Sequence, residues 1–438
     1  MESQLYPLLS EYDPATSSEG GLDPLGLYPI ADRLAEKLVP AVRERQKHPR
    51  FLTAMALGAE LCKNFDNDTM AADSISPPWQ VFEWYVVEGM VRTSQDPEEI
   101  LGVPGTDKAR QAIKDNVPLS AKRYLKTPSV FGFHGVYRVL AENLDIVQDE
   151  TLGETGYQLL TTWEKEQKLK GFISEEAGEG TDFRKQIFAA IQDGLKAKAT
   201  ARSGGWSGWS FFLDHLAPFK CGKKEAEVIR DALLSRDCEF RRETILFLVS
   251  SPGQKAWLTS RSEREFHQAL RENARNELKV LLEAIEKYEE FSRVLQDVFD
   301  DCLQEMTRKR TKTSLKELAG LELIKRAWRQ LSGLYSEVCS RLEPLREAFD
   351  FEQRFSSLAE PGNLIDWIDR LLEHHVKVQR AKPPAGKNPW FERTGDGSII
   401  LRRCDKTDKG GIHDKSYLHF YRTNPLWSFV CDLRLVGS

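Results

Sequence analysis

The sequence predicts a mainly α-helical protein of several domains, with an embedded winged helix and a small β element near its C-terminus. Three features favour this fold class. The run from Arg264 to Met306 contains neither Gly nor Pro, a helical pattern between Phe131 and Leu160 changes into short apolar segments, and turn residues surround Asp396. With 438 residues the chain is too long for one ordinary core, so we expect about two to four domains.

Composition narrows the class of protein. With 40% hydrophobic and 29% charged residues the chain is globular, and its longest apolar run, Ile245–Val249, is too short to span a bilayer. The first 30 residues carry five acids and no Lys or Arg, unlike a secretory leader, so we expect a cytoplasmic protein without membrane contact. Its seven cysteines are scattered without a CxxC pair, which predicts reduced thiols, no zinc site and no cofactor.

Turn residues and changes in composition divide the chain into five predicted segments. They are a flexible arm (1–27), an N-terminal helical domain (28–104), a winged-helix-like domain (105–180), a helical domain with a long helical hairpin (181–375) and a basic C-terminal α+β segment (376–438). In the second segment, Pro77 and Pro78 suit a helix start. Trp79, Phe82 and Val86 then share one helix face, as core residues do.

The third segment has the order of a winged helix. Pro118–Ser129 contains a short predicted helix that ends before Pro128, because the residue before proline disfavours the helical conformation. Gly132–Asn143 is the next predicted helix, Leu144–Leu152 has the turn chemistry of a hairpin, and Thr155 caps a third helix. The order helix, turn, helix, hairpin, helix predicts a module that binds duplex DNA or docks a protein.

Charge in this segment is uneven. Residues 105–140 hold seven basic side chains and two acids, whereas residues 141–180 hold ten acids and three lysines. A local basic surface is what phosphate contacts need, although a solvated helix face gives the same pattern. The predicted DNA contacts are three cations before the turn and two outward side chains of the second helix: Lys122, Arg123, Lys126, His134 and Arg138.

The C-terminal segment offers a second candidate surface for nucleic acid. Residues 376–438 hold twelve basic side chains and six acids, interleaved with aromatic residues, and Arg402 and Arg403 follow the predicted strand Ile399–Leu401. Basic and aromatic side chains together suit single strands or RNA. They equally suit a helix packed on the body of the protein.

The long run ending at Met306 predicts one helix or two nearly collinear ones. Its apolar residues keep a spacing of three or four, and a second helical set extends from Leu315 to Ala348. Two long antiparallel helices would bury each other's apolar stripes. We expect a scaffold hairpin here.

Catalytic motifs give only one alternative. The chain has no GxxxxGK[ST], GxSxG or HExxH sequence. Arg43 and His48, and likewise Arg370 and His375, have the Arg-xxxx-His spacing of helical, metal-independent RNases, so an RNase effector is the rival prediction.

Gly21–Cys62 resembles the N-terminal signature of a poorly characterised bacterial family. The shared features are Asp23-Pro24-Leu25-Gly26, Leu38-Val39-Pro40 and Arg50-Phe51, and the winged-helix-like stretch and His419–Arg434 are also similar. Members are encoded in anti-phage defence loci beside helicases and nucleases. The resemblance implies an accessory subunit that binds duplex DNA, protein subunits of a defence complex, or both, with no catalytic residues.

Overall fold

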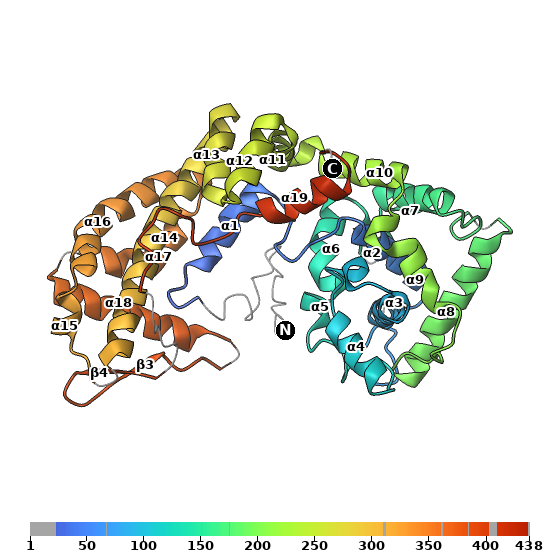
Figure 1. Cartoon of the computed structure of the whole chain (residues 1–438), viewed down its shortest axis with the longest axis horizontal. Helices are drawn as coiled ribbons and strands as arrows, with labels where there is room; N and C mark the ends of the chain where they lie inside the picture. Colours follow the sequence, from blue (N-terminus) through green and yellow to red (C-terminus); the bar gives the residue numbers. More distant parts are fainter. Residues whose placement is uncertain are drawn as a thin grey trace, which may run out of the picture. The chain divides into compact units, whose positions relative to one another are not determined.

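The computed structural model describes residues 23–66, 68–149, 151–174, 176–309, 312–360, 362–383, 385–402 and 410–436. These residues form nineteen α-helices and two two-stranded antiparallel sheets, so the predicted mainly helical fold is confirmed (Figure 1). None of the described helices is long and apolar enough to cross a membrane. No disulfide bond joins the six cysteines within the described ranges.

Contacts group the chain into two compact units whose boundaries differ from the predicted segments. The first unit joins the chain up to Leu38 with Ser251–Tyr421, and the second joins Val39–Ser250 with Arg422–Ser438. The first unit contains α1 (Tyr28–Leu38), α12 (Ser251–Ser260), α13 (Glu263–Asn273), α14 (Asn276–Lys309), α15 (Leu315–Ala319), α16 (Glu322–Leu342), α17 (Ala348–Ala359), α18 (Leu364–Ala381), β3 (Phe391–Arg393) and β4 (Ile399–Leu401).

The long hairpin of the first unit is formed by α14 and α16. α14 is a separate helix of 34 residues, because the helical conformation is interrupted at Ala274, between the end of α13 and Asn276. Ion pairs join Lys287 to Glu337 at 3.0 Å and Glu283 to Arg341 at 2.6 Å, so the two helices run antiparallel as predicted. The predicted second helix is interrupted near Gly320, where α15 ends.

The end of the predicted arm is packed against the first unit. Leu25 and Leu27 are buried, and the Asp23 carboxylate accepts hydrogen bonds from the amides of Leu27 and Tyr28 at 3.0 and 2.9 Å. This carboxylate satisfies free amides at the start of α1. Residues 1–22 lie outside the described residues.

The second unit surrounds α3, which buries almost every side chain along its length. Pro78 occupies its first turn, where a missing amide hydrogen has no cost. The elements of this unit are α2 (Phe51–Cys62), α3 (Pro78–Thr93), α4 (Thr106–Lys114), α5 (Pro128–Phe131), α6 (Phe133–Asn143), β1 (Val147–Gln148), β2 (Thr151–Leu152), α7 (Glu154–Glu166), α8 (Glu179–Ala197), α9 (Trp209–Leu216), α10 (Lys223–Leu233), α11 (Glu239–Val249) and α19 (Thr423–Asp432).

One predicted helix is wrong. The chain before Pro128 forms turns, and Pro128 begins the short helix α5 instead of following one. A proline that excludes the helical conformation at the preceding residue is equally suited to the first position of a helix.

The predicted hairpin is confirmed, with Val147 of β1 opposite Leu152 of β2. The helix that follows it begins at Glu154, so Thr155 lies inside the helix and does not cap it.

Candidate nucleic-acid surface

The helix α6, predicted to enter the major groove, is largely covered by its neighbours. Phe133, Val136, Tyr137 and Leu140 are buried. The Tyr137 hydroxyl also accepts hydrogen bonds from two backbone amides of the chain before α2, at 3.0 and 3.2 Å. Arg138 is the predicted contact that α6 does expose.

His134 does not face outward as predicted. Its ring stacks on Trp79 of α3, with 4.1 Å between ring centroids and 18° between ring planes. Burial lowers the pKa of His134 to about 4, so the imidazole is neutral at physiological pH. His134 is therefore a packed side chain and not a cation available to phosphate.

Lys122, Arg123 and Lys126, here called the basic turn, are exposed between α4 and α5. Arg123 lies 3.8 Å from Asp115, at the outer limit of an ion pair between exposed groups. Neither Lys122 nor Lys126 forms an ion pair with any described residue. The turn therefore presents cations whose charge is not cancelled locally.

A buried contact fixes the basic turn to the core. Between Arg123 and Lys126, the Tyr124 side chain points inward, and its hydroxyl donates to the Glu83 carboxylate of α3 at 2.6 Å. The second oxygen of Glu83 accepts a hydrogen bond from the amide of His134 at 3.2 Å, in the first turn of α6. Glu83 thus holds the basic turn and the start of α6 at one point.

Burial dominates the electrostatics of this contact. It raises the pKa of Glu83 from 4.5 to about 7, although Tyr124 and the α6 amides favour the ionised form. Gly132 is required beside it, because a Cβ there would lie 2.0 Å from a Glu83 oxygen. Sequence reasoning missed Glu83 and Tyr124, yet a lone acid inside the apolar helix segment VFEWYVV was a usable signal.

The C-terminal candidates belong to the first unit, whereas the basic turn belongs to the second. Arg402, beside β4, is half-exposed and pairs with Glu392 of β3 at 2.6 Å. The charge of Arg402 is therefore partly neutralised by Glu392 within the hairpin of β3 and β4. Arg403 lies outside the described residues.

The Arg-xxxx-His pairs do not form an exposed acid–base site. His375 is fully buried; its Nδ1 contacts the Pro24 carbonyl at 2.9 Å, and its Nε2 accepts from the Trp390 amide at 3.1 Å. Both ring nitrogens are therefore engaged with backbone. His48 pairs with Asp432 at 2.7 Å, and Arg370 donates to the Glu360 carbonyl.

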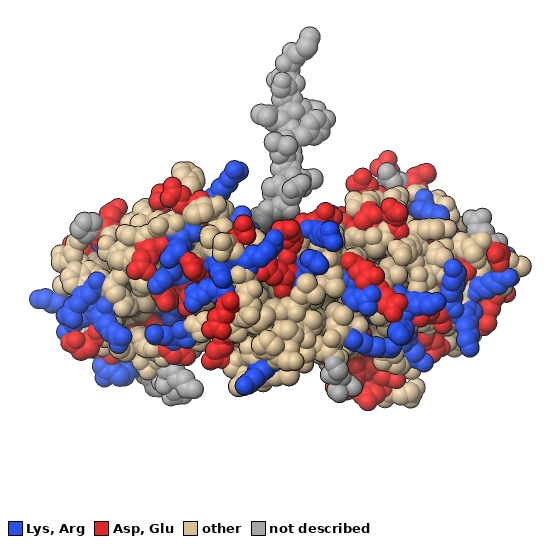
Figure 2. All heavy atoms as spheres, turned by 90° about the horizontal axis from the view of Figure 1, so that it is seen from above, with Lys and Arg blue, Asp and Glu red and all other residues tan. Residues whose placement is uncertain are grey.

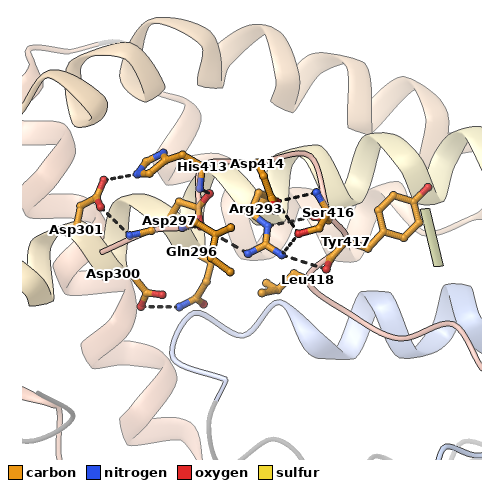
Figure 3. A network of polar contacts seen from close by, with 12 residues as sticks. Arg293, Gln296, Asp297, Asp300, Asp301, His413, Asp414, Ser416, Tyr417 and Leu418 are labelled. Carbon is orange, nitrogen blue, oxygen red and sulfur yellow. Dashed lines mark hydrogen bonds and ion pairs between the residues drawn. The ribbon is translucent and has the colours of Figure 1, made fainter. Parts of the chain in front are cut away.

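A second charged cluster lies on α14, where four side chains at intervals of four residues hold an extended segment of the same unit. We call Glu289, Arg293, Asp297 and Asp301 the α14 ladder, and Gly410–Tyr421 the strap. Figure 3 shows Arg293 donating to the carbonyls of Ser416 and Tyr417. Each member of the ladder is buried.

The carboxylates of the α14 ladder also bind strap backbone. Asp297 accepts from the amides of Ile412 and His413 at 3.1 and 2.9 Å, and Asp301 accepts from Gly411 at 2.7 Å. Glu289 accepts hydrogen bonds from the Leu418 amide and the Tyr421 hydroxyl. The ladder therefore uses its charges internally, and it was not identified from the sequence.

Over the face drawn in Figure 2, the described Lys and Arg side chains are interspersed with Asp and Glu. Charge density alone therefore does not distinguish a binding surface on that face, and the pairing of each side chain has to be considered. No group of three or more His, Cys, Asp or Glu residues within the described ranges is arranged to hold a metal ion. None of the family models, curated proteins or solved structures compared with the chain matches it.

Proposed function

We propose that this protein is a non-catalytic DNA-binding subunit that contacts the phosphate backbone of duplex DNA through the basic turn and Arg138. The observation that supports the proposal most directly is the combination of exposed cations with a buried anchor. Lys122 and Lys126 lack carboxylate partners among the described residues, and Tyr124 between them is fixed to Glu83. A rigid turn loses little conformational entropy when its cations bind phosphate.

Arg138 extends the proposed surface by one helical turn from His134. Because Glu83 binds the amide of His134 as well as Tyr124, the start of α6 and the basic turn share one anchor. α6, the hairpin and α7 would then act as a winged-helix module that binds mainly backbone. The covered face of α6 offers few side chains to base edges, so the proposal predicts weak sequence preference.

The resemblance to accessory proteins of anti-phage defence loci gives the proposal its context. In that context the protein would bring DNA to a helicase or nuclease subunit. The α14–α16 hairpin is suited to a scaffold, because its length offers a rigid surface and ion pairs join its two helices.

The test is fluorescence anisotropy on two duplexes of unrelated sequence over a salt series. Three or four phosphate contacts predict similar affinities for both duplexes and a log-affinity against log-salt slope of about −3. Arg138→Ala should weaken both complexes alike, whereas a base contact would cost about 1–3 kcal/mol on one sequence only. A slope near zero, or no binding at low salt, would contradict the proposal.

A further inference from the structure

A cavity of about 240 Å³ lies within the second unit, and its lining includes Glu83 and His134 described above. Four elements and one loop line it: α2, α3, the start of α6, the β1–β2 hairpin, and the loop after α2. A buried apolar cavity of about 150 Å³ is enough for benzene, so this one has room for two fused rings.

The walls of the cavity suit a flat apolar body. On α2, the small residues Ala54, Gly58 and Ala59 leave the space open, and a Cβ on Gly58 would already lie 3.0 Å from the Phe82 ring. The wall formed by α3 includes Trp79, which is half-exposed. The Trp79 ring stacks on the His134 ring, which also lines the cavity. Aromatic faces attract both planar rings and cations.

The charges at the cavity favour a cation. Asp66 and Asp149 line it, are exposed, and form no ion pair with the described residues. The one lysine of the lining, Lys63, pairs with Glu60 at 2.7 Å and shares that carboxylate with Arg184, so two unpaired carboxylates face one lysine. The described rim is therefore acidic, in contrast to the basic turn of the same unit.

His134 adds an imidazole to the lining of the cavity. Its ring lines the cavity and makes no hydrogen bond with any described residue. A neutral imidazole offers one acceptor nitrogen to an N–H donor. A ligand with an aromatic ring and an ammonium group would stack on the Trp79 side, donate to His134 and lie near two carboxylates.

We propose that this cavity binds a small aromatic amine in its cationic form. The inference does not depend on DNA binding, because Lys122, Arg123 and Lys126 do not line the cavity; the cavity shares only their anchor, Glu83. Three naphthalene probes of the same ring size separate charge from shape: 1-naphthylmethylamine, 1-naphthalenemethanol and 1-naphthoic acid. Isothermal titration calorimetry of the full chain with each probe measures the preference.

The amine should bind about tenfold more tightly than the alcohol, and the acid should bind most weakly. Asp66→Asn and Asp149→Asn should each weaken the amine about two- to fivefold and leave the alcohol unchanged. Asp149 has a positive φ of 46°, which asparagine also tolerates. Asp231→Asn removes an exposed carboxylate on α10, outside the cavity lining, and should leave the amine affinity unchanged.

Ala54→Leu tests the location, because the larger side chain would occupy the cavity and should abolish binding of all probes. The charge variants lie at the surface and keep the proposal testable even if the filled variant does not fold. Equal affinity for the three probes, no saturable binding, or equal losses in Asp66→Asn and Asp231→Asn would each overturn the proposal.

Discussion

The basic turn of the second unit and the α14 ladder of the first unit both concentrate charged side chains, but their environments differ. The ladder is buried, and its groups bind the backbone of the strap at 2.5–3.3 Å. In the basic turn, Lys122 and Lys126 are exposed and without carboxylate partners among the described residues. A charged cluster therefore indicates a binding surface only where its charges are not already used by the fold.

The largest expected loss of stability comes from removing a member of the α14 ladder. Glu289→Ala should lower the free energy of unfolding by about 4 kcal/mol, because it leaves a partly buried amide, a histidine ring and a buried tyrosine hydroxyl without their acceptor. Urea unfolding followed by circular dichroism measures the loss. Glu290→Ala, one position along, removes only a partly exposed pair with Lys287 and should cost less than about 1 kcal/mol. Equal losses would show that the ladder is not specific.

The next effect concerns Glu83 and depends on pH. Because its folded pKa is raised from 4.5 to about 7, its stabilising contribution is complete below pH 4.5 and is lost as pH rises through 7. The total change is at most about 3 kcal/mol. Glu83→Gln, which resembles the protonated carboxyl, should flatten the stability profile between these pH values. Identical profiles in urea titrations of both proteins would contradict the assignment.

A smaller effect tests the close packing of the strap. A Cβ on Gly411 would lie 2.5–2.6 Å from Asp297 atoms that include its backbone, so Gly411→Ala should cost about 2 kcal/mol through overpacking. Gly395→Ala is the matched control, since nothing lies within 4 Å of its Cβ. Thermal unfolding of the two variants should separate them, and equal melting temperatures would indicate that the strap moves away freely.

Local sequence rules predicted the elements better than their environments. The Gly- and Pro-free run gave α14, and turn chemistry gave the hairpin, because both depend on neighbouring residues. Pro128 was ambiguous, since a proline can follow a helix or begin one. His134 was placed outward by helical spacing, but Trp79 on another helix covers it.

The candidate site was also predictable only in part, because local sequence patterns do not show which distant residues the fold brings together. The exposed cations Lys122, Arg123 and Lys126 could be identified from local charge. Their anchor could not, because Glu83 precedes Tyr124 by 41 residues and only the fold brings them to 2.6 Å. The ladder repeats every four residues along α14, yet its partner, the strap, lies more than a hundred residues later.

The most direct test of the DNA-binding surface is the salt dependence of duplex binding in Lys122→Ala/Arg123→Ala. Removing two phosphate contacts should weaken binding to every sequence and reduce the magnitude of the log-affinity against log-salt slope by up to about 1.8. Lys223→Ala/Lys224→Ala, which removes two exposed adjacent lysines of α10 in the same unit, is the matched control and should keep the wild-type slope. Circular dichroism verifies that both variants are folded. An unchanged slope in the first variant, or an equal reduction in both, would contradict the account.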